Sequence, residues 1–429
     1  MKNKFFTRSF VPAAQSLQAV RQGMVIKMKS MKYVVVLGDG MADEPIDVLG
    51  GRTPLEYGDT PALDRLSKAS EIGLAHTIPE GMKPGSDTAN LSVLGYNPAI
   101  YYSGRSPLEA LSIGVPMKDT DIALRCNIVT ISEEDKPFEE RIIIDHSSGE
   151  ISTEDCTVLL EAVKKELENE TFRFYAGTSY RHCLIWKEGR VIELSQPHDI
   201  LGKTIGPYLP ENKEFLDMMK KSYQILAEHP INIERKRQGL NPANCCWFWG
   251  AGTKPKLTSF EEKNGVKGMM VSAVDLLKGI AVGAGMGVAQ VEGATGGLNT
   301  NYEGKVKAAV DALKSGYDFA YIHIEAPDEM GHQGSVEKKV KAIEYLDKRV
   351  IAPLTEALER EGIEYRLLVM PDHPTPIRVR THTADSVPYL LFDSRKQEKQ
   401  TWDYNEKEAK KSGNYIAEGY TMLDKLLQK

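Results

Sequence analysis

The sequence predicts an α/β protein in which a mostly parallel sheet, flanked by helices, is interrupted by an inserted α+β domain. Short apolar runs rich in β-branched residues occur at 33–37, 318–324 and 365–370, and such runs are typical of buried parallel strands. A long helical pattern separates the last two runs, and strands that alternate with helices indicate a sheet covered on both faces. Residues 121–195 instead alternate between polar and apolar side chains, which favours an antiparallel sheet.

The expected core elements follow in order along the chain. The strand at 33–37 ends in a Gly-Asp-Gly turn. A helical pattern follows over 60–73, with Thr60 as its N-cap and Gly73 as its closing residue. In the C-terminal third, a long amphipathic helix is expected over 336–360, between two strands.

These patterns divide the chain into an extension, a split core and an insert. Residues 1–30 are basic and contain no Asp or Glu, a composition also found in targeting segments, but they lack the long apolar stretch of a secretory signal. We expect them to be disordered, or to reflect a start codon placed too far upstream. The core should comprise residues 31–119 and 264–429, and the inserted domain residues 120–263.

The composition restricts the partners and the compartment. The 429 residues include 60 acidic and 54 basic side chains, and a net charge of −6 offers no electrostatic footprint for nucleic acid. No run approaches the roughly 18 apolar residues of a membrane helix. The five cysteines are an odd number, and Cys245 and Cys246 are adjacent, so a disulfide scaffold is not expected. A reducing, cytoplasmic environment is therefore favoured.

Histidines are concentrated in the last third of the sequence. Four of the nine, namely His323, His332, His373 and His382, fall within one 60-residue stretch. His323 alternates with isoleucines inside an expected strand, so we interpret it as a core residue or as a residue that supports a site from behind.

Three aspartates occupy positions suited to metal ligands. Asp39 follows the first strand, Asp372 follows the strand at 365–370, and Asp328 lies four residues before His332. Open α/β sheets place ligands at the carboxyl ends of strands, and mixed carboxylate and imidazole sets suit zinc or manganese. A single aspartate of this kind is usually a turn residue, but the whole set predicts a metal site: Asp39, Asp328, His332, Asp372, His373 and His382.

Ser86 is the candidate nucleophile. It follows a glycine and opens an expected short helix, where a hydroxyl meets free backbone amides and the positive end of the helix dipole. This position suits a phosphorylated serine, and a nearby metal ion would lower the pKa of the hydroxyl. The alternative for this segment alone is an ordinary N-cap serine.

Seven segments point to a known family, in the order VVVLGDGMADEP, KPGSDTANLSVLGYNP, YYSGRSPLEALSIG, ATGGLNTNYEGK, IEAPDEMGHQG, VMPDHPTPI and RTHTADSVP. From about residue 31 to its C-terminus, the chain resembles the cofactor-independent phosphoglycerate mutases in their shorter archaeal-type form, within the alkaline phosphatase superfamily. The resemblance implies an alkaline-phosphatase-like core and a small phosphorylated metabolite as substrate, with no nucleic-acid or membrane partner.

The resemblance also implies two divalent metal ions, manganese above all, with zinc, magnesium and cobalt as alternatives. One ion would be held by Asp328, His332 and His382, and the other by Asp39, Asp372, His373 and the oxygen of Ser86. Ser86 would take the phosphate of 3-phosphoglycerate as a phosphoserine and return it to the 2-hydroxyl of the same glycerate. No 2,3-bisphosphoglycerate would be required.

The resemblance further suggests side chains that would bind the anionic substrate. Arginines pair with carboxylate and phosphate groups through two parallel hydrogen bonds. This sequence departs from the longer bacterial form of the family, whose nucleophile motif and inserted domain are different. The candidates are Arg105, Arg181, His182, Asp199, Arg235 and Lys278.

Three other functions share the same motifs. One branch of the family has been proposed to act as homoserine kinases, but a kinase must bind ATP, and the sequence contains neither a Walker A motif nor a kinase-type glycine-rich loop. This favours the mutase. A phosphatase would result if water reached the phosphoserine. A non-catalytic homologue is disfavoured because every expected ligand and Ser86 are present.

Overall fold

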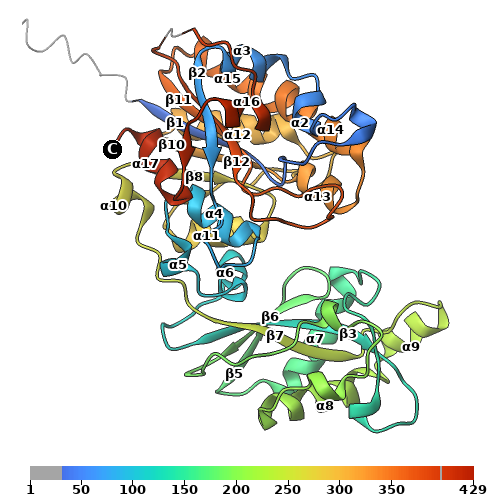
Figure 1. Ribbon diagram of the computed structural model, residues 1–429. Coiled ribbons are helices and arrows are strands. Elements are labelled where there is room, and N and C mark those ends of the chain that lie inside the picture. Colours follow the sequence, from blue (N-terminus) through green and yellow to red (C-terminus); the bar gives the residue numbers. More distant parts are fainter. Residues whose placement is uncertain (1–30, 397–398) are drawn as a thin grey trace, which may run out of the picture.

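The computed structural model describes residues 31–396 and 399–429, so the expected extension at 1–30 lies outside the described residues. Two sheets, one of eight strands and one of five, lie in separate units (Figure 1). We call the unit with the eight-stranded sheet the core and the other unit the insert. Among the described residues, no helix is long and apolar enough to cross a membrane.

The core sheet is mixed but mostly parallel. Its order is β13 (Tyr415–Ile416), β2 (Ser70–Ala75), β12 (Val387–Asp393), β11 (Tyr365–Met370), β1 (Lys32–Gly38), β10 (Phe319–Ile324), β8 (Gly268–Val271) and β9 (Gly287–Val288). The strands from β11 to β9 are all parallel, whereas β12 is antiparallel to both of its neighbours. This arrangement confirms the expected α/β fold class.

Helices cover both faces of this sheet because the apolar residues of β1 alternate between them. Val34 and Val36 belong to one buried cluster, and Val35 and Leu37 belong to the other. The first face is covered by α2 (Pro54–Tyr57), α3 (Pro61–Ser67), α12 (Tyr302–Lys314), α13 (Ala326–His332), α14 (Val336–Leu346) and α15 (Ala352–Arg360). The second face is covered by α4 (Ser86–Val93), α6 (Arg105–Ser112), α10 (Phe260–Asn264), α11 (Asp275–Gly283) and α17 (Met422–Leu427).

Strand register brings distant parts of the sequence to one edge of the sheet. Leu37 of β1 pairs with His323 of β10 on one side and with Met370 of β11 on the other. The three strands therefore end side by side, and the residues that follow them, including Asp39 and Asp372, emerge at the same carboxyl edge.

The insert is an antiparallel sheet backed by helices. Its strands are β3 (Ile122–Ile131), β4 (Ile143–Asp145), β5 (Phe172–Tyr175), β6 (Arg181–Trp186) and β7 (Cys245–Thr253), and its helices are α7 (Thr153–Leu167), α8 (Lys213–Leu226) and α9 (Pro230–Arg237). β3 is antiparallel to β4, β6 and β7. A separate hydrophobic cluster fills this unit. All five cysteines lie in the insert, free and buried.

The junctions between the units can be placed from packing. β3 begins at Ile122 and β7 ends at Thr253, whereas Phe260 packs in the core beside Phe319. We therefore propose that the insert ends before Phe260, a little earlier than the expected boundary at 263.

Two helix predictions had different outcomes. The helix expected over 60–73 is too long: α3 covers Pro61–Ser67, and Gly73 lies inside strand β2. Gly73 has no room for a side chain because Asn414 and Tyr389 lie against it. The glycine therefore allows close packing within the sheet and does not end a helix. The helix expected over 336–360 is confirmed as α14, a π-helical turn at Asp347–Ile351, and α15.

A buried ion pair supports the loop that follows β1. The ammonium group of Lys339 on α14 is fully buried and donates hydrogen bonds to the Asp43 carboxylate at 2.8 Å, to the Thr375 carbonyl at 2.8 Å and to the Ala42 carbonyl at 3.2 Å.

Replacing Lys339 with methionine should lower the free energy of unfolding by about 3 to 5 kcal/mol, because Asp43 would remain as an unpaired buried charge. Urea denaturation measures this loss. Lys338→Met, on the exposed face of the same helix, is the matched control and should change stability little. Equal losses in the two variants would contradict the prediction.

Candidate active site

Two clusters of ligating side chains meet at the carboxyl edge of the core sheet. The ligating atoms of Asp39, Asp372 and His373 lie within 4.8 Å of one another, and so do those of Asp328, His373 and His382. Fold and register thus bring together residues that are separated by more than 300 positions in the sequence.

The first cluster is built around Asp328. α13 places Asp328 one helical turn before His332, whose Nε2 lies 3.2 Å from Asp328 Oδ2. Nε2 of His382 lies 3.5 Å from Asp328 Oδ1 and 3.1 Å from Nε2 of His332. The other nitrogen of His332, Nδ1, donates to the carbonyl of Arg380 at 3.0 Å, which directs Nε2 into the cluster.

The side chains of the Asp328 cluster shift one another's pKa values in opposite directions. Burial opposes the charged form of Asp328, but hydrogen bonds with His332 and His382 hold the pKa of this carboxyl well below its ordinary value. In return, the hydrogen bond with Asp328 raises the pKa of His332 to about 9.

The second cluster is built around Asp39. Oδ2 of Asp39 lies 3.0 Å from Nε2 of His323, a fully buried residue on the neighbouring strand β10, and Nδ1 of His323 lies 3.2 Å from the hydroxyl of Ser272. Burial lowers the pKa of His323 to about 3, so the ring is neutral and donates from Nε2 to Asp39. His323 thus lies behind a candidate ligand and not among the ligands, which agrees with one of the two sequence interpretations.

Asp39 also shows why a cation fits. Its Oδ1 is buried and has no hydrogen-bond partner among the described residues. Burial and the charges of Asp372 and Asp328 raise the pKa of Asp39 well above its ordinary value. An unpartnered carboxylate oxygen, surrounded by other carboxylates and imidazoles, has the chemistry of a divalent-cation site.

His373 belongs to both clusters and faces the candidate nucleophile. Its Nε2 lies 3.1 Å from the hydroxyl oxygen of Ser86 and 3.6 Å from Asp39 Oδ1. The hydroxyl of Thr375 donates to Asp328 at 2.5 Å, so its oxygen accepts from Nδ1 of His373 at 3.3 Å. Burial lowers the pKa of His373, so this ring is neutral and its Nε2 presents a lone pair that accepts from the hydroxyl of Ser86.

Ser86 is the first residue of α4, as expected. One turn along the helix, the amide of Asn90 donates to the carbonyl of Ser86 and to Asp372 Oδ2, both at 2.8 Å. The hydroxyl of Tyr321 donates to the side-chain amide oxygen of Asn90, Oδ1, at 2.6 Å. The Asn90 side chain therefore links α4, which carries the candidate nucleophile, to the loop that carries Asp372.

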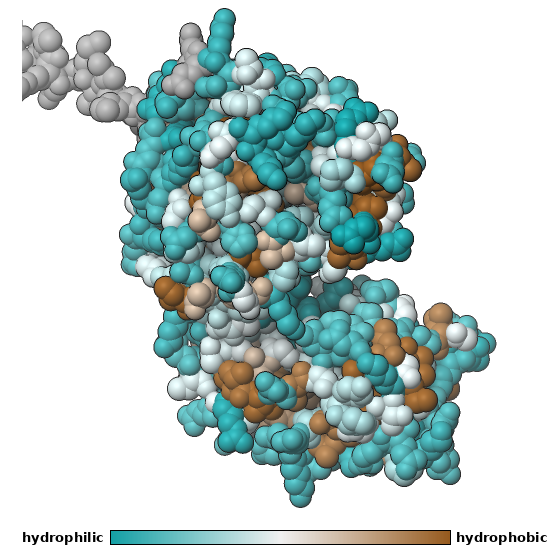
Figure 2. Space-filling view, viewed as in Figure 1, coloured by the Kyte–Doolittle hydropathy of each residue, from teal (hydrophilic) through white to brown (hydrophobic). Residues whose placement is uncertain are grey.

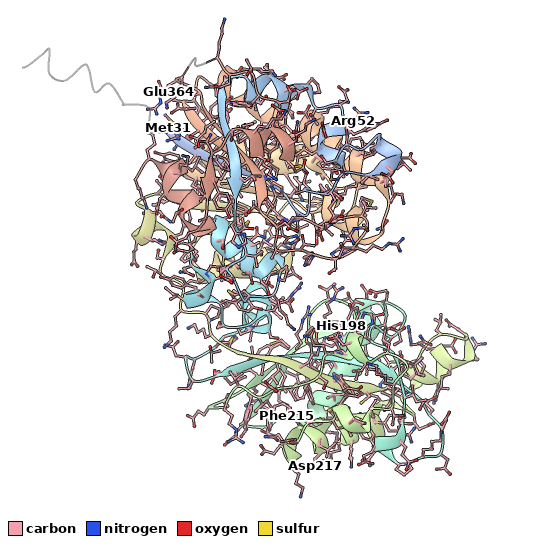
Figure 3. All side chains as sticks on the ribbon, in the orientation of Figure 1. Met31, Arg52, His198, Phe215, Asp217 and Glu364 are labelled. Carbon is pink, nitrogen blue, oxygen red and sulfur yellow. The ribbon has the colours of Figure 1, made fainter. Side chains whose placement is uncertain are left out.

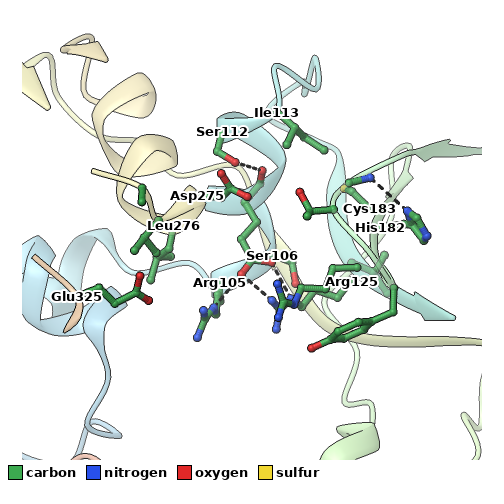
Figure 4. A pocket seen from close by; sticks show the side chains of 18 of the residues that line it. Arg105, Ser106, Ser112, Ile113, Arg125, His182, Cys183, Asp275, Leu276 and Glu325 are labelled. Carbon is green, nitrogen blue, oxygen red and sulfur yellow. Dashed lines mark hydrogen bonds and ion pairs between the residues drawn. The ribbon is translucent and has the colours of Figure 1, made fainter. Parts of the chain in front are cut away.

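A pocket of about 450 Å³ lies between the core and the insert (Figures 2 and 4). Three predicted substrate ligands, Arg105, Arg181 and His182, line it. Glu325 and Glu329, on the core side, line its opposite wall, three residues before and one residue after the candidate ligand Asp328. The pocket therefore adjoins the two candidate ligand clusters.

The other three predicted substrate ligands do not line this pocket. Lys278 on α11 pairs with Asp275, a pocket residue, at 3.2 Å. Asp199 is exposed beside His198, which Figure 3 places on the side of the insert that faces the core. Arg235 is buried, and its guanidinium donates to the carbonyls of Asn241 at 2.9 Å and Ser148 at 2.6 Å, so it holds loops of the insert together.

Comparison with known proteins agrees with this geometry. The sequence model of the family described as 2,3-bisphosphoglycerate-independent phosphoglycerate mutase matches residues 67–232. A curated relative with this description from Methanosarcina barkeri is 49% identical over 389 residues, covering 90% of this chain and 96% of the relative. A second, from Methanosarcina mazei, is 47% identical over the same length, with the same coverage. The chain therefore belongs to the 2,3-bisphosphoglycerate-independent phosphoglycerate mutase family.

A solved structure of this family supports the assignment. The cofactor-independent phosphoglycerate mutase from Thermoplasma acidophilum matches with a TM-score of 0.63 and 27% identity, covering 93% of this chain and 99% of that chain. The predicted family and the enzyme class, an isomerase that acts on a small phosphorylated substrate, are confirmed.

Sequence reasoning missed several residues that organise this family member's site. Asn90 and Thr375 are neutral and carry no signal of their own, although Asn90 lies four residues after Ser86 and Thr375 two after His373. Glu109 and Arg125 were also missed. Arg125 donates to the Glu109 carboxylate at 2.6 and 2.8 Å, and both residues line the pocket.

His182 lines the pocket, but its ring is engaged within the insert. Nε2 lies 3.2 Å from the Cys156 sulfur, and Nδ1 accepts from the Gly177 backbone N–H at 3.2 Å. Burial lowers the pKa of His182 from 6.5 to about 4. A neutral, engaged imidazole is a poor anion ligand, so we assign His182 a structural role.

The pH dependence of stability tests this assignment. Between pH 6.5 and pH 4 the unfolded chain binds a proton at His182 and the folded chain does not, so the free energy of unfolding falls as the pH falls through this range. The loss is on the order of 3 kcal/mol. His182→Gln removes the titrating group, so its unfolding free energy should fall less between pH 7 and pH 4.5 in urea titrations. Parallel curves for the two proteins would contradict the prediction.

Proposed function

We propose that the enzyme interconverts 3-phosphoglycerate and 2-phosphoglycerate through a phosphoserine on Ser86, with two divalent metal ions, manganese first, and without 2,3-bisphosphoglycerate. The observation that carries the proposal is the position of the Ser86 hydroxyl, 3.1 Å from Nε2 of His373, the residue shared by both ligand clusters. Asp328, His332 and His382 would hold one ion. Asp39, Asp372, His373 and the Ser86 oxygen would hold the other.

The ions would lower the pKa of the serine hydroxyl and neutralise charge on the phosphoryl group. The chain itself orients the nucleophile. The Asn90 side chain holds the first turn of α4, and the positive end of the helix dipole favours an anionic phosphoryl group at Ser86. Zinc, magnesium and cobalt ions are alternatives to manganese for the same ligand set. Metal analysis of the purified enzyme would show which ion is bound.

The pocket between the units explains why transfer is favoured over hydrolysis. Arg105 and Arg181 would bind the carboxylate of the glycerate while Ser86 holds the phosphate. Because the glycerate stays bound, its second hydroxyl reacts as an effectively intramolecular partner. The insert, which forms one wall of the pocket, excludes water from the phosphoserine.

The assay uses the full chain loaded with manganese and free of 2,3-bisphosphoglycerate. One arm supplies 3-phosphoglycerate and couples the product to enolase. A second arm supplies homoserine and ATP, and a third measures release of inorganic phosphate. Turnover in the first arm alone supports the mutase. Turnover in the second or third arm alone would replace it with a kinase or a phosphatase.

The enzyme's location is part of the same proposal. We place it in the cytoplasm, supported by five cysteines that are all free and buried within the insert. Fractionation of cells that express the full chain would test this.

A further inference from the structure

The carboxylate of Glu109 connects the two units at the pocket. Glu109 lies on α6, which packs closely on α11 of the core: a side chain at Gly279 would collide with the backbone of Leu108. Its partner Arg125 lies on β3, the central strand of the insert. The two hydrogen bonds from Arg125 to Glu109, at 2.6 and 2.8 Å, therefore join the core to the insert (Figure 4).

The same carboxylate also holds a second guanidinium group. Nε of Arg105, one helical turn before Glu109, donates to Glu109 Oε1 at 2.9 Å. One carboxylate thus accepts three N–H groups from two arginines. Burial opposes the charged form, but the charges and hydrogen bonds of Arg125 and Arg105 lower the pKa of Glu109, so it is an anion at neutral pH.

This arrangement determines what the pocket presents to a ligand. Only Nε of Arg105 is used by Glu109, so the terminal nitrogens of this half-exposed side chain remain available to a ligand. Arg125 is further fixed by stacking on the Trp249 ring, 4.6 Å from its centroid. Arg181 also lines the pocket, so three arginines lie around the carboxylate of Glu109. The other carboxylates of the lining are Asp275, which pairs with Lys278, and Glu325 and Glu329 on the opposite wall.

We propose that Glu109 is a positioning residue: it orients Arg105 and Arg125 together, so that the pocket binds the carboxylate of the small phosphorylated hydroxy acid only when core and insert are joined. The inference rests on the proposed function. Glu109 itself does not touch the substrate, since its two oxygens are occupied by the arginines.

The test compares Glu109→Gln with the wild-type enzyme, both loaded with manganese. Glutamine keeps the shape of the side chain but loses the charge and one acceptor, so both guanidinium groups lose their fixed orientation. We expect KM for 3-phosphoglycerate to rise about 10- to 100-fold, in line with the loss of charge-assisted hydrogen bonds, and kcat to fall by less. Phosphate labelling of Ser86 at saturating substrate should be retained. Glu161→Gln, an exposed glutamate paired with Lys164 on α7, is the matched control and should leave KM unchanged.

A double-mutant cycle separates positioning from a general structural effect. If Glu109 acts through Arg125, the effects of Glu109→Gln and Arg125→Gln on KM will not add in the double variant. Additive effects, or a variant with lower thermal stability and unchanged KM, would overturn the inference. A wild-type enzyme without mutase turnover would instead refute the proposed function, so the two failures are distinguishable.

Discussion

Replacing Ser86 with alanine will abolish mutase turnover, with a loss of about 10⁴-fold or more. The hydroxyl is the only atom that the proposed mechanism uses to accept the phosphate, and removal of a nucleophile usually costs this much. The enolase-coupled assay measures the loss. Ser92→Ala is the matched control, because Ser92 lies on the same helix and its hydroxyl donates to the backbone carbonyl of Thr77 and not to a candidate ligand.

The control should retain turnover even if its stability drops. Full activity of Ser86→Ala would show that the phosphate passes through another group, or directly between the two hydroxyls. Loss of activity in both variants would indicate disruption of α4, and the nucleophile would then have to be assigned from the phosphopeptide.

Replacing Asp39 with asparagine will have opposite effects on activity and on the stability of the metal-free protein. Turnover should fall by about 10³-fold or more, since one ion would lose a ligand whose charge stabilises the transition state. The metal-free variant should be more stable than the metal-free wild type. Burial and two neighbouring carboxylates raise the pKa of Asp39, so above the ordinary pKa of an aspartate the ionised group destabilises the fold.

Differential scanning calorimetry with and without manganese tests this pair of expectations. The wild type should gain about 2.7 kcal/mol per ion when manganese is supplied at 100 times its Kd, and Asp39→Asn should gain less. Chelation should abolish turnover of the wild type, and added manganese should restore it. A wild type that works normally after chelation, or a metal-free Asp39→Asn that is less stable than the metal-free wild type, would contradict the account.

Asp39 and Asp372, at the carboxyl edge of the core sheet, were predictable because the strands before them have a local sequence pattern. The apolar runs around 33–37 and 365–370 mark two strands, and the polar residues Asp39 and Asp372 directly follow them. Parallel pairing then brings these residues together. His382 was grouped with them by residue type, although the loop that carries it has no regular structure.

Residues that act through long-range pairing could not be predicted in the same way. The pair between Glu109 and Arg125 depends on how the insert sheet meets α6, which no local pattern encodes. Arg235 was a candidate anion ligand because arginine pairs with carboxylate and phosphate groups, but folding buries it against backbone carbonyls. The segment 60–73 has helical periodicity throughout, yet its second half pairs with β12, because tertiary pairing overrides local preference.

In the proposed mechanism, the phosphate rests on Ser86 between the two transfers. The enzyme, loaded with manganese, is mixed with 3-phosphoglycerate and quenched in acid within its first turnovers, and its peptides are mapped by mass spectrometry. Phosphate is expected on the peptide that contains Ser86, and none on this peptide in Ser86→Ala. Phosphate on a different residue, or an unmodified enzyme during full turnover, would contradict the mechanism.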